Sequence, residues 1–262
     1  MFRIRSQFQP IAEAAVLKTL GTASATSFGT TLKMISWNMF KARRAGCMPD
    51  LTSLAAGVEL ACLQEAVLHG GLAHPFHLTS GLEWIMAENL GTDQAITTGP
   101  KTGSRVPSLS RAAIRSHHHE PFIGTPKTFL QTTYPFADSE LLVINVHAIN
   151  LVSTAKFAHQ VEQMVAPVAA HKGPCIVAGD FNTWNPSRWH LLLKSMAEVR
   201  APSRARRRAP AAPLQPSPGP RLLPRHEVFE FARPCAREKL RPRPPLGRVR
   251  AELSLGYSLR PW

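Results

Sequence analysis

Polar side chains follow four apolar runs of this sequence, at the point where each run ends. The carboxylates, amides and imidazole among them are groups that can bind a hard cation or move protons. In proteins built around a sheet, sites usually form where strands end. We therefore expect one site to gather the following four segments: Ser36-Trp37-Asn38, Leu63-Gln64-Glu65, Asn145-Val146-His147 and Gly179-Asp180-Phe181-Asn182.

The spacing of apolar residues predicts the elements that position these segments. Short apolar runs bounded by polar residues indicate buried strands, and apolar residues three or four apart indicate helices. A tight turn at 137–139 joins two strands into a hairpin, and Pro167 predicts a kink within a helix. The pattern predicts strands at 32–38, 58–65, 126–136, 140–147 and 175–182, and helices at 50–57, 153–173 and 187–199. Such mixed elements favour an α/β (α+β) fold with helices around a pair of sheets.

Composition divides the chain into three parts. Residues 1–30 have no clear periodicity and end in a stretch rich in Ser, Thr and Gly, which indicates a leader or linker. Residues 31–199 carry the predicted elements. The part 200–262 differs, because from Ala201 it contains 12 of the 23 prolines and no pattern that would bury a core. Two explanations stay open for it: a disordered tail, or the product of a shifted reading frame over GC-rich DNA.

The net charge of +14 would ordinarily indicate a polyanionic partner such as nucleic acid. Its distribution weakens that inference, because 13 Arg and one Lys against four Glu place +10 of it in the last 62 residues. The predicted domain is only mildly basic.

The cysteines and the hydropathy pattern bear on the compartment. Four cysteines form no CxxC pair, and Cys62 and Cys175 lie inside apolar runs, as reduced core residues do. No apolar stretch approaches the roughly 20 residues of a membrane span. We expect a cytoplasmic monomer without a membrane span.

Taken in order, the four segments resemble the successive motifs of the endonuclease/exonuclease/phosphatase (DNase I-like) family. They read ISWNMFKA, LACLQEA, VINVHAIN and VAGDFNTW, and the resemblance runs from about Met34 to Val199. The motifs are similar to those of small bacterial members whose strands carry NxHAIN and AGDFN. The resemblance implies a four-layer sandwich of two mixed β-sheets flanked by helices, and Mg²⁺-dependent hydrolysis of a phosphoester, either as a phosphodiesterase or nuclease or as a phosphatase.

The resemblance also implies a role for each site residue. Glu65 is the carboxylate ligand of Mg²⁺, with Mn²⁺ as an alternative, and Asn38 supports the metal and a phosphate oxygen. Asp180 orients or deprotonates the attacking water, and Asn182 donates to the charged transition state. His147 hydrogen-bonds a phosphate oxygen or assists protonation. Without the resemblance, the same residues would be explained as a surface Glu, turn residues and a core-edge His.

Two further features lie outside the four motifs. Lys127 could help to hold phosphate, although a solvated Lys beside a Pro is the favoured explanation. The run His117-His118-His119-Glu120 is a poor tetrahedral metal set, because consecutive side chains diverge, and we expect a loop near the site mouth. Substrate choice in the family depends on loops such as 99–125, which have no decodable pattern here.

The sequence departs from the family at its C-terminal end. Family members finish with a strand bearing an Asp and a Ser/Thr-Asp-His ending, whereas no Asp follows Asp180 and neither His190 nor His226 has a matching context. The fold is then C-terminally incomplete, and a missing acid/base group typically costs about 10²–10⁴ in rate. The alternative is a catalytically inert binding module whose basic tail contacts nucleic acid.

Overall fold

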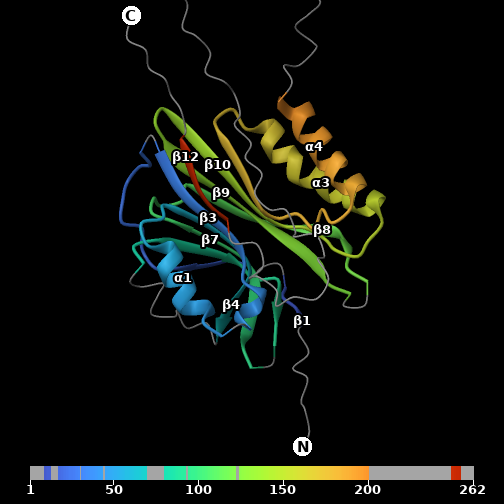
Figure 1. Ribbon diagram of the computed structural model, residues 1–262, viewed down its shortest axis with the longest axis horizontal. Helices are drawn as coiled ribbons and strands as arrows, with labels where there is room; N and C mark the ends of the chain where they lie inside the picture. Colours follow the sequence, from blue (N-terminus) through green and yellow to red (C-terminus); the bar gives the residue numbers. More distant parts are fainter. Residues whose placement is uncertain are drawn as a thin grey trace, which may run out of the picture.

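The computed structural model of this 262-residue chain describes residues 9–12, 17–29, 31–43, 45–69, 80–92, 94–121, 124–200 and 249–254. Within them, two β-sheets pack face to face and helices cover the two outer surfaces (Figure 1). The described helices and strands have the following bounds. The strands are β1 (Gln9–Pro10), β2 (Leu17–Leu20), β3 (Thr31–Asn38), β4 (Leu60–His69), β5 (Glu83–Ala87), β6 (Leu90–Gly91), β7 (Ile96–Ser104), β8 (Ser110–His119), β9 (Pro126–Phe136), β10 (Ser139–His147), β11 (Cys175–Asp180) and β12 (Val249–Ser254). The helices are the 3₁₀ turn η2 (Phe40–Ala42), α1 (Cys47–Ala55), α3 (Thr154–Ala170) and α4 (Pro186–Arg200).

Both sheets mix parallel and antiparallel pairs. The larger sheet runs β1-β6-β7-β4-β3-β12, with β5 also paired to β7 and β2 paired to β5. The smaller sheet runs β11-β10-β9-β8. The parallel pairs are β3 with β4, which flank α1 in the chain, and β10 with β11, which flank α3. In each sheet a parallel pair therefore brings two carboxyl strand ends together.

Alternation along the strands divides the core into layers. Leu32 and Met34 of β3 pack between the sheets with Val143 of β10, whereas Ile35 and Trp37 pack on the outer side with α1. The helices α3 and α4 cover the outer face of the smaller sheet (Figure 1). Since side chains along a strand point alternately to opposite faces, the period-two patterns of β3 and β10 require a layer on each side. The expected four-layer sandwich of two mixed β-sheets flanked by helices is confirmed.

Most of the elements predicted inside 31–199 are present. The hairpin of β9 and β10 turns at Ala137 and Asp138, and the helix α3 begins after Ser153, whose hydroxyl accepts a hydrogen bond from the Lys156 N–H. Pro167 lies inside α3 as expected. These are the segments with the strongest periodicity in the sequence.

The expectation of a loop at 99–125 was wrong, because most of it lies in β7 and β8. β7 contains Gly99, Pro100 and Lys101, which are residues depleted in strands. It is nevertheless central, with β4 on one side and β5 and β6 on the other. Pro100 is tolerated because it falls where the β4–β7 register shifts, between the pairs Leu63 with Lys101 and Ala66 with Gly99. Likewise, residues 117–119 end β8 and do not form the expected loop.

Strands also occur in the two flanking parts of the chain. Within 1–30, β1 pairs with β6 and β2 pairs with β5. Within 200–262, where no regular element was expected, β12 pairs antiparallel with β3. An edge strand offers unpaired backbone groups, so such pairing needs little side-chain signal. The rest of 201–262 lies outside the described residues, and the division at 31 and 200 stays a prediction. In the described parts of the chain, no helix has both the length and the hydropathy that a membrane crossing requires.

Candidate active site

Four neighbouring strands place the candidate residues at one end of the space between the sheets. The inward positions of β3, β4, β10 and β11 are apolar in the middle of the sandwich and polar at the carboxyl end. In the parallel register, Asn38 lies beside Gln64, and His147 lies beside Asp180. The strand ends therefore bring motifs more than a hundred residues apart into one polar group.

Asp180 connects two of the candidate segments by hydrogen bonds. Its Oδ2 accepts a 2.8 Å hydrogen bond from the Asn38 Nδ2, and its Oδ1 accepts a 3.1 Å bond from the Asn182 backbone N–H. Asn38 is itself fixed, since its Oδ1 accepts a 3.0 Å bond from the Phe40 N–H. The Asn182 side chain turns toward the other loop and donates from Nδ2 to the Ala148 carbonyl at 2.7 Å. The carboxylate of Asp180 thus has a fixed orientation between the two sheets.

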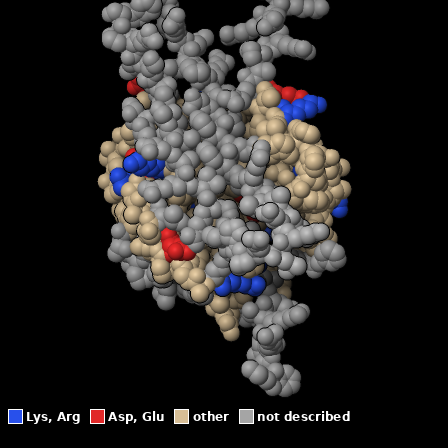
Figure 2. Space-filling view, viewed as in Figure 1, with Lys and Arg blue, Asp and Glu red and all other residues tan. Residues whose placement is uncertain are grey.

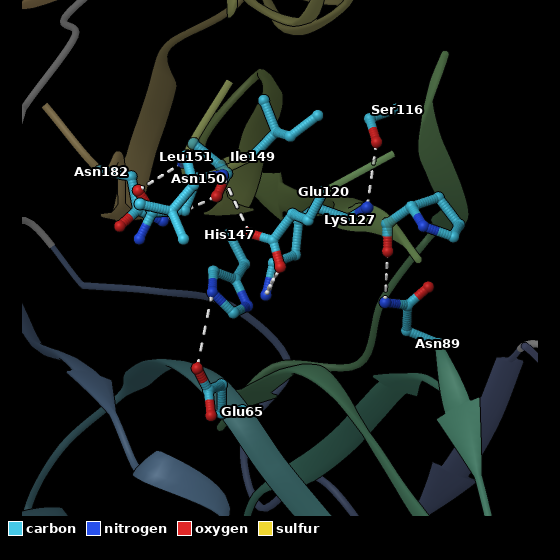
Figure 3. Close-up of polar contacts among 12 residues, drawn as sticks. Glu65, Asn89, Ser116, Glu120, Lys127, His147, Ile149, Asn150, Leu151 and Asn182 are labelled. Carbon is cyan, nitrogen blue, oxygen red and sulfur yellow. Dashed lines mark hydrogen bonds and ion pairs between the residues drawn. The ribbon is translucent and has the colours of Figure 1, made fainter. Parts of the chain in front are cut away.

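A β-bulge in β4 determines where the Glu65 side chain points. The register with β7 shifts between Leu63 and Ala66, and Glu65 has a left-handed φ of 48°. Regular alternation would place Glu65 on the outer face with Leu63. Instead its Oε1 lies 3.7 Å from the Nε2 of His147, on the opposite sheet (Figure 3). Bulges often re-aim a side chain in this way beside active sites.

His147 is buried and uncharged at neutral pH. Desolvation by burial, followed by the positive charges of Lys127 and Lys41, holds its pKa well below the ordinary value of 6.5. The 3.7 Å contact with Glu65 is therefore a polar contact and not a full ion pair. A neutral imidazole has one N–H donor and one acceptor nitrogen, so His147 can donate one hydrogen bond, for example to a phosphate oxygen.

Lys127 has an acidic partner that the sequence did not indicate. Its Nζ lies 3.4 Å from the Oε2 of Glu120, and its side chain is 17% exposed. The other oxygen of Glu120 accepts a 2.8 Å bond from the Asn150 N–H. Figure 3 shows this pair near the imidazole of His147. The interpretation of Lys127 as a solvated lysine was wrong, and Glu120 was missed because its run was assigned to a loop.

The buried side chain of Asn145 links the strands that carry the site. Asn145, two residues before His147, is completely buried. Its Nδ2 donates to the carbonyls of Leu63 and Lys101, and its Oδ1 accepts from the Gln64 Nε2 at 2.8 Å. These bonds link β10 to β4 and β7 across the sandwich. Because buried polar groups are costly when unpaired, they fix the offset of one sheet against the other.

The donor set suits a magnesium ion better than a metal that needs several strong ligands. Among the described residues, no group of three or more His, Cys, Asp and Glu side chains is placed to hold a metal. Mg²⁺ commonly uses one or two carboxylates and keeps several waters. Glu65 offers a partly exposed carboxylate at the site, and the Asn38 Oδ1 has a second lone pair. These two residues fit a one-carboxylate Mg²⁺ site.

In Figure 2 the described acidic and basic residues form separate small groups, and no continuous basic patch is visible among them on that face. Local positive charge at the site comes from Lys41 and Lys127, which both act on His147.

The residues predicted for the site fall into two groups at adjacent strand ends, and Lys127 pairs with Glu120 beside them. Asn38, Asp180 and Asn182 are joined by hydrogen bonds, and Glu65 and His147 are in contact. Glu120 was not predicted, and Asn145 was named within its segment without a role of its own. Asn145 could have been found, since an Asn inside the apolar run LLVINVH needs a buried partner.

The chain is similar to several known proteins. A sequence model of the Endonuclease/Exonuclease/phosphatase family matches residues 35–235. A UPF0294 protein of Vibrio vulnificus (strain YJ016) is 38% identical over 167 residues, which cover 60% of this chain and 55% of the relative. A UPF0294 protein of Klebsiella pneumoniae (strain 342) is 30% identical over 217 residues, which cover 78% of each chain. The chain spans about half the length of the Vibrio relative that it matches.

One solved structure is similar to part of this chain. The endonuclease/exonuclease/phosphatase from Beutenbergia cavernae DSM 12333 has 16% sequence identity and a TM-score of 0.48, over 65% of this chain and 54% of that one. The family match covers most of the chain and includes all four strand-end motifs. This protein belongs to the endonuclease/exonuclease/phosphatase family and has its phosphoesterase fold.

Proposed function

We propose that this chain is a Mg²⁺-dependent phosphoesterase that hydrolyses a phosphodiester by in-line attack of water. One observation carries the proposal: the strand ends place Asp180 beside His147. Asn38 and Asn182 orient the Asp180 carboxylate by hydrogen bonds. His147 in turn contacts Glu65 on the other sheet. A carboxylate, amide donors and an uncharged imidazole are the groups that a hydrolytic phosphate site requires.

Each residue has a defined task in this proposal. Glu65 and Asn38 hold Mg²⁺, with Mn²⁺ as an alternative ion; when bound, the ion supplies positive charge against the phosphate oxygens. Asp180 orients the attacking water and accepts its proton. His147 donates a hydrogen bond to a phosphate oxygen, and the Asn182 amide supports the charge that develops there. Lys127, kept near the site by Glu120, contributes a positive charge for the substrate.

Nucleic acid is the substrate class that we propose first, with a smaller phosphoester as the nearest variant. The site has several groups that can recognise phosphate, and Lys41 and Lys127 both place positive charge near His147. The family fold is compatible with either class.

Hydrolysis of bis(p-nitrophenyl) phosphate in the presence of Mg²⁺ tests the proposal. Glu65→Gln removes the anionic ligand, so Mg²⁺ binding measured by calorimetry should weaken and kcat should fall by about 10² or more. Lys127→Ala should cost far less. Glu59→Gln is the matched control, since Glu59 precedes the same strand and its Oε2 accepts a bond from the Lys33 N–H outside the site.

The opposite result would favour the binding module. If wild type and Glu65→Gln bind no Mg²⁺ and release no nitrophenol, the hydrolytic proposal fails. Retention of single-stranded RNA on a filter that is lost on deleting 201–262 would then indicate that the basic tail, and not the site, makes the contact.

The C-terminal departure leads to an expectation about turnover. Within these 262 residues no Asp follows Asp180, so a chain of these residues alone does not contain the Asp–His pair that the family resemblance implies. We propose that turnover is limited for this reason. Grafting a family ending with Asp and His after residue 199 should raise kcat by about 10², the scale of one acid/base group. Equal rates in the two chains would contradict this part of the proposal.

A further inference from the structure

Arg188 is a fully buried arginine near the beginning of α4. Its side chain has no exposed surface, although arginine is rarely buried completely. Its backbone N–H donates to the Asn185 Oδ1 at 2.9 Å, which fixes the first turn of the helix. Burial lowers the pKa of Arg188 to about 10, with Glu120 acting in the opposite direction, so the guanidinium is charged at neutral pH.

The guanidinium connects the two loops that follow the site strands. Its Nη1 donates to the Asn182 carbonyl at 3.0 Å, in the loop after β11. Its Nη2 donates to the Ile149 carbonyl at 2.6 Å, in the loop after β10. One loop carries Asn182 and follows Asp180 directly, and the other follows His147. A single planar group therefore contacts the backbone on both sides of the candidate site.

Aromatic rings hold the guanidinium in place. Its central carbon lies 4.1 Å from the ring centroid of Phe157 in α3 and 5.6 Å from that of Trp184. Arginine stacks on aromatic faces and presents its donors in a rigid fork, which a lysine ammonium does not. The Gln160 side chain of α3 accepts a 2.7 Å bond from the Ile149 N–H, so the same loop is held from a second side.

The loop after β11 needs such support because of its backbone conformation. Asn182 has a left-handed φ of 48°. Non-glycine residues in that region store strain and persist only where surrounding contacts determine them. The bond from Arg188 to the Asn182 carbonyl and the bond from Asn182 Nδ2 to Ala148 are the contacts that do so.

We propose that Arg188 is a positioning residue of the hydrolytic site, which fixes the loops 148–152 and 181–185 relative to each other so that His147, Asp180 and Asn182 keep one geometry. The effect on catalysis rests on the proposed function. The claim that Arg188 fixes the two loops does not. Arg188 contacts no substrate; it acts through the two carbonyls.

Hydrogen–deuterium exchange separates Arg188 from a residue of general structural importance. In Arg188→Met, amides in 148–152 and 181–185 should exchange at least about tenfold faster, while those of β10 and α3 keep wild-type rates, because the two loops lose a shared donor and the packed core does not. Arg115→Met is the matched control: its guanidinium donates to the Ile11 carbonyl and to neither loop. Arg188→Lys retains the charge without the fork, so intermediate exchange is expected, and this variant decides the question if Arg188→Met does not fold.

The kinetic readout tests the same idea independently. Loss of positioning should lower kcat toward bis(p-nitrophenyl) phosphate by about 10², with KM and Mg²⁺ affinity within about threefold of wild type, since Glu65 lies on the other sheet. Wild-type exchange in both loops of Arg188→Lys and Arg188→Met overturns the proposal. Faster exchange over the whole chain also overturns it, because it shows general destabilisation. If wild type itself is inactive, the proposed function fails while the exchange result still decides the role of Arg188.

Discussion

Exchanging the two hydrogen-bonded side chains Asn38 and Asp180 should separate the stability of the site from its activity. In Asp180→Asn, one carboxylate oxygen becomes an amide donor. The Asn182 backbone N–H cannot reorient, so the new amide must turn its nitrogen toward the Asn38 Nδ2, 2.8 Å away, and two donors then face each other. Asn38 cannot flip to accept without losing the bond from the Phe40 N–H. In Asn38→Asp, two carboxylates face each other instead.

The size of each effect follows from these contacts. A hydrogen bond to a charged group contributes about 1.5–3 kcal/mol when buried, and the partial exposure of Asp180 and Asn38 reduces this to about 1–2 kcal/mol for each single variant. In the double variant Asn38→Asp/Asp180→Asn, the amide of residue 180 donates to the carboxylate of residue 38. The bonds from Phe40 and Asn182 also keep their acceptors. The unfolding free energy should therefore return to within about 1 kcal/mol of wild type, a coupling of about 2 kcal/mol.

Urea unfolding of the four chains measures the coupling, and phosphodiester hydrolysis measures the function. Stability should recover in the double variant, whereas kcat should stay about 10² or more below wild type, because no carboxylate remains at residue 180 to accept the proton of water. Additive losses in the double variant would refute the hydrogen-bond arrangement. Recovery of hydrolysis together with stability would refute the role of Asp180 as the base.

Two further predictions concern the folded state. Desolvation lowers the pKa of Lys101 to about 7, and the charge of Glu88 partly offsets this effect. Between pH 7 and 8.5 the unfolded chain therefore binds a proton that the folded chain releases. The urea concentration at the unfolding midpoint should rise with pH in this range. Lys101→Met should remove that slope; above about pH 9 the Cys62 thiol, whose pKa burial raises to about 12, should act in the opposite direction and flatten the rise. Gly179→Ala should cost more than about 3 kcal/mol or prevent folding, since φ is +145° and the new Cβ would lie 2.0 Å from the Val146 carbonyl oxygen. Gly57→Ala, also at positive φ but with nothing within 4 Å, should cost only about 1 kcal/mol by the same urea assay.

The sequence predicts those strands and helices whose apolar residues follow a regular spacing. The alternation of β10 and the helical spacing of Phe157, Val161 and Met164 in α3 come from surfaces that bury one face, and both elements lie where they were expected. β7 could not be found in this way, because its place is set by strands on both sides and not by its own propensity. Pro100 alone argues against a central strand, and only the bulge opposite it removes the conflict.

The candidate site residues could be named from the sequence, but their hydrogen-bond partners could not. Strand ends and family motifs identify Glu65, His147 and Asp180, since each is a polar residue that ends an apolar run. The partners Glu120 and Arg188 act through backbone groups of loops that are far away in the sequence. Such contacts leave no periodic signal, because any residue supplies a carbonyl or an N–H. Their detection needs coordinates.

Backbone strain distinguishes the functional interpretation of this site from a purely structural one. Glu65 and Asn182 both have a φ of 48°, a conformation that costs an L-residue roughly 1 kcal/mol and that glycine adopts freely. Here the side chains are retained, and the strain has a consequence at each: the bulge turns Glu65 from the outer face toward His147, and the turn at Asn182 directs its amide to the Ala148 carbonyl. The bulge at Glu65 is better explained by the chemistry of its carboxylate than by packing, because a regular strand would place that side chain on the outer face, away from His147.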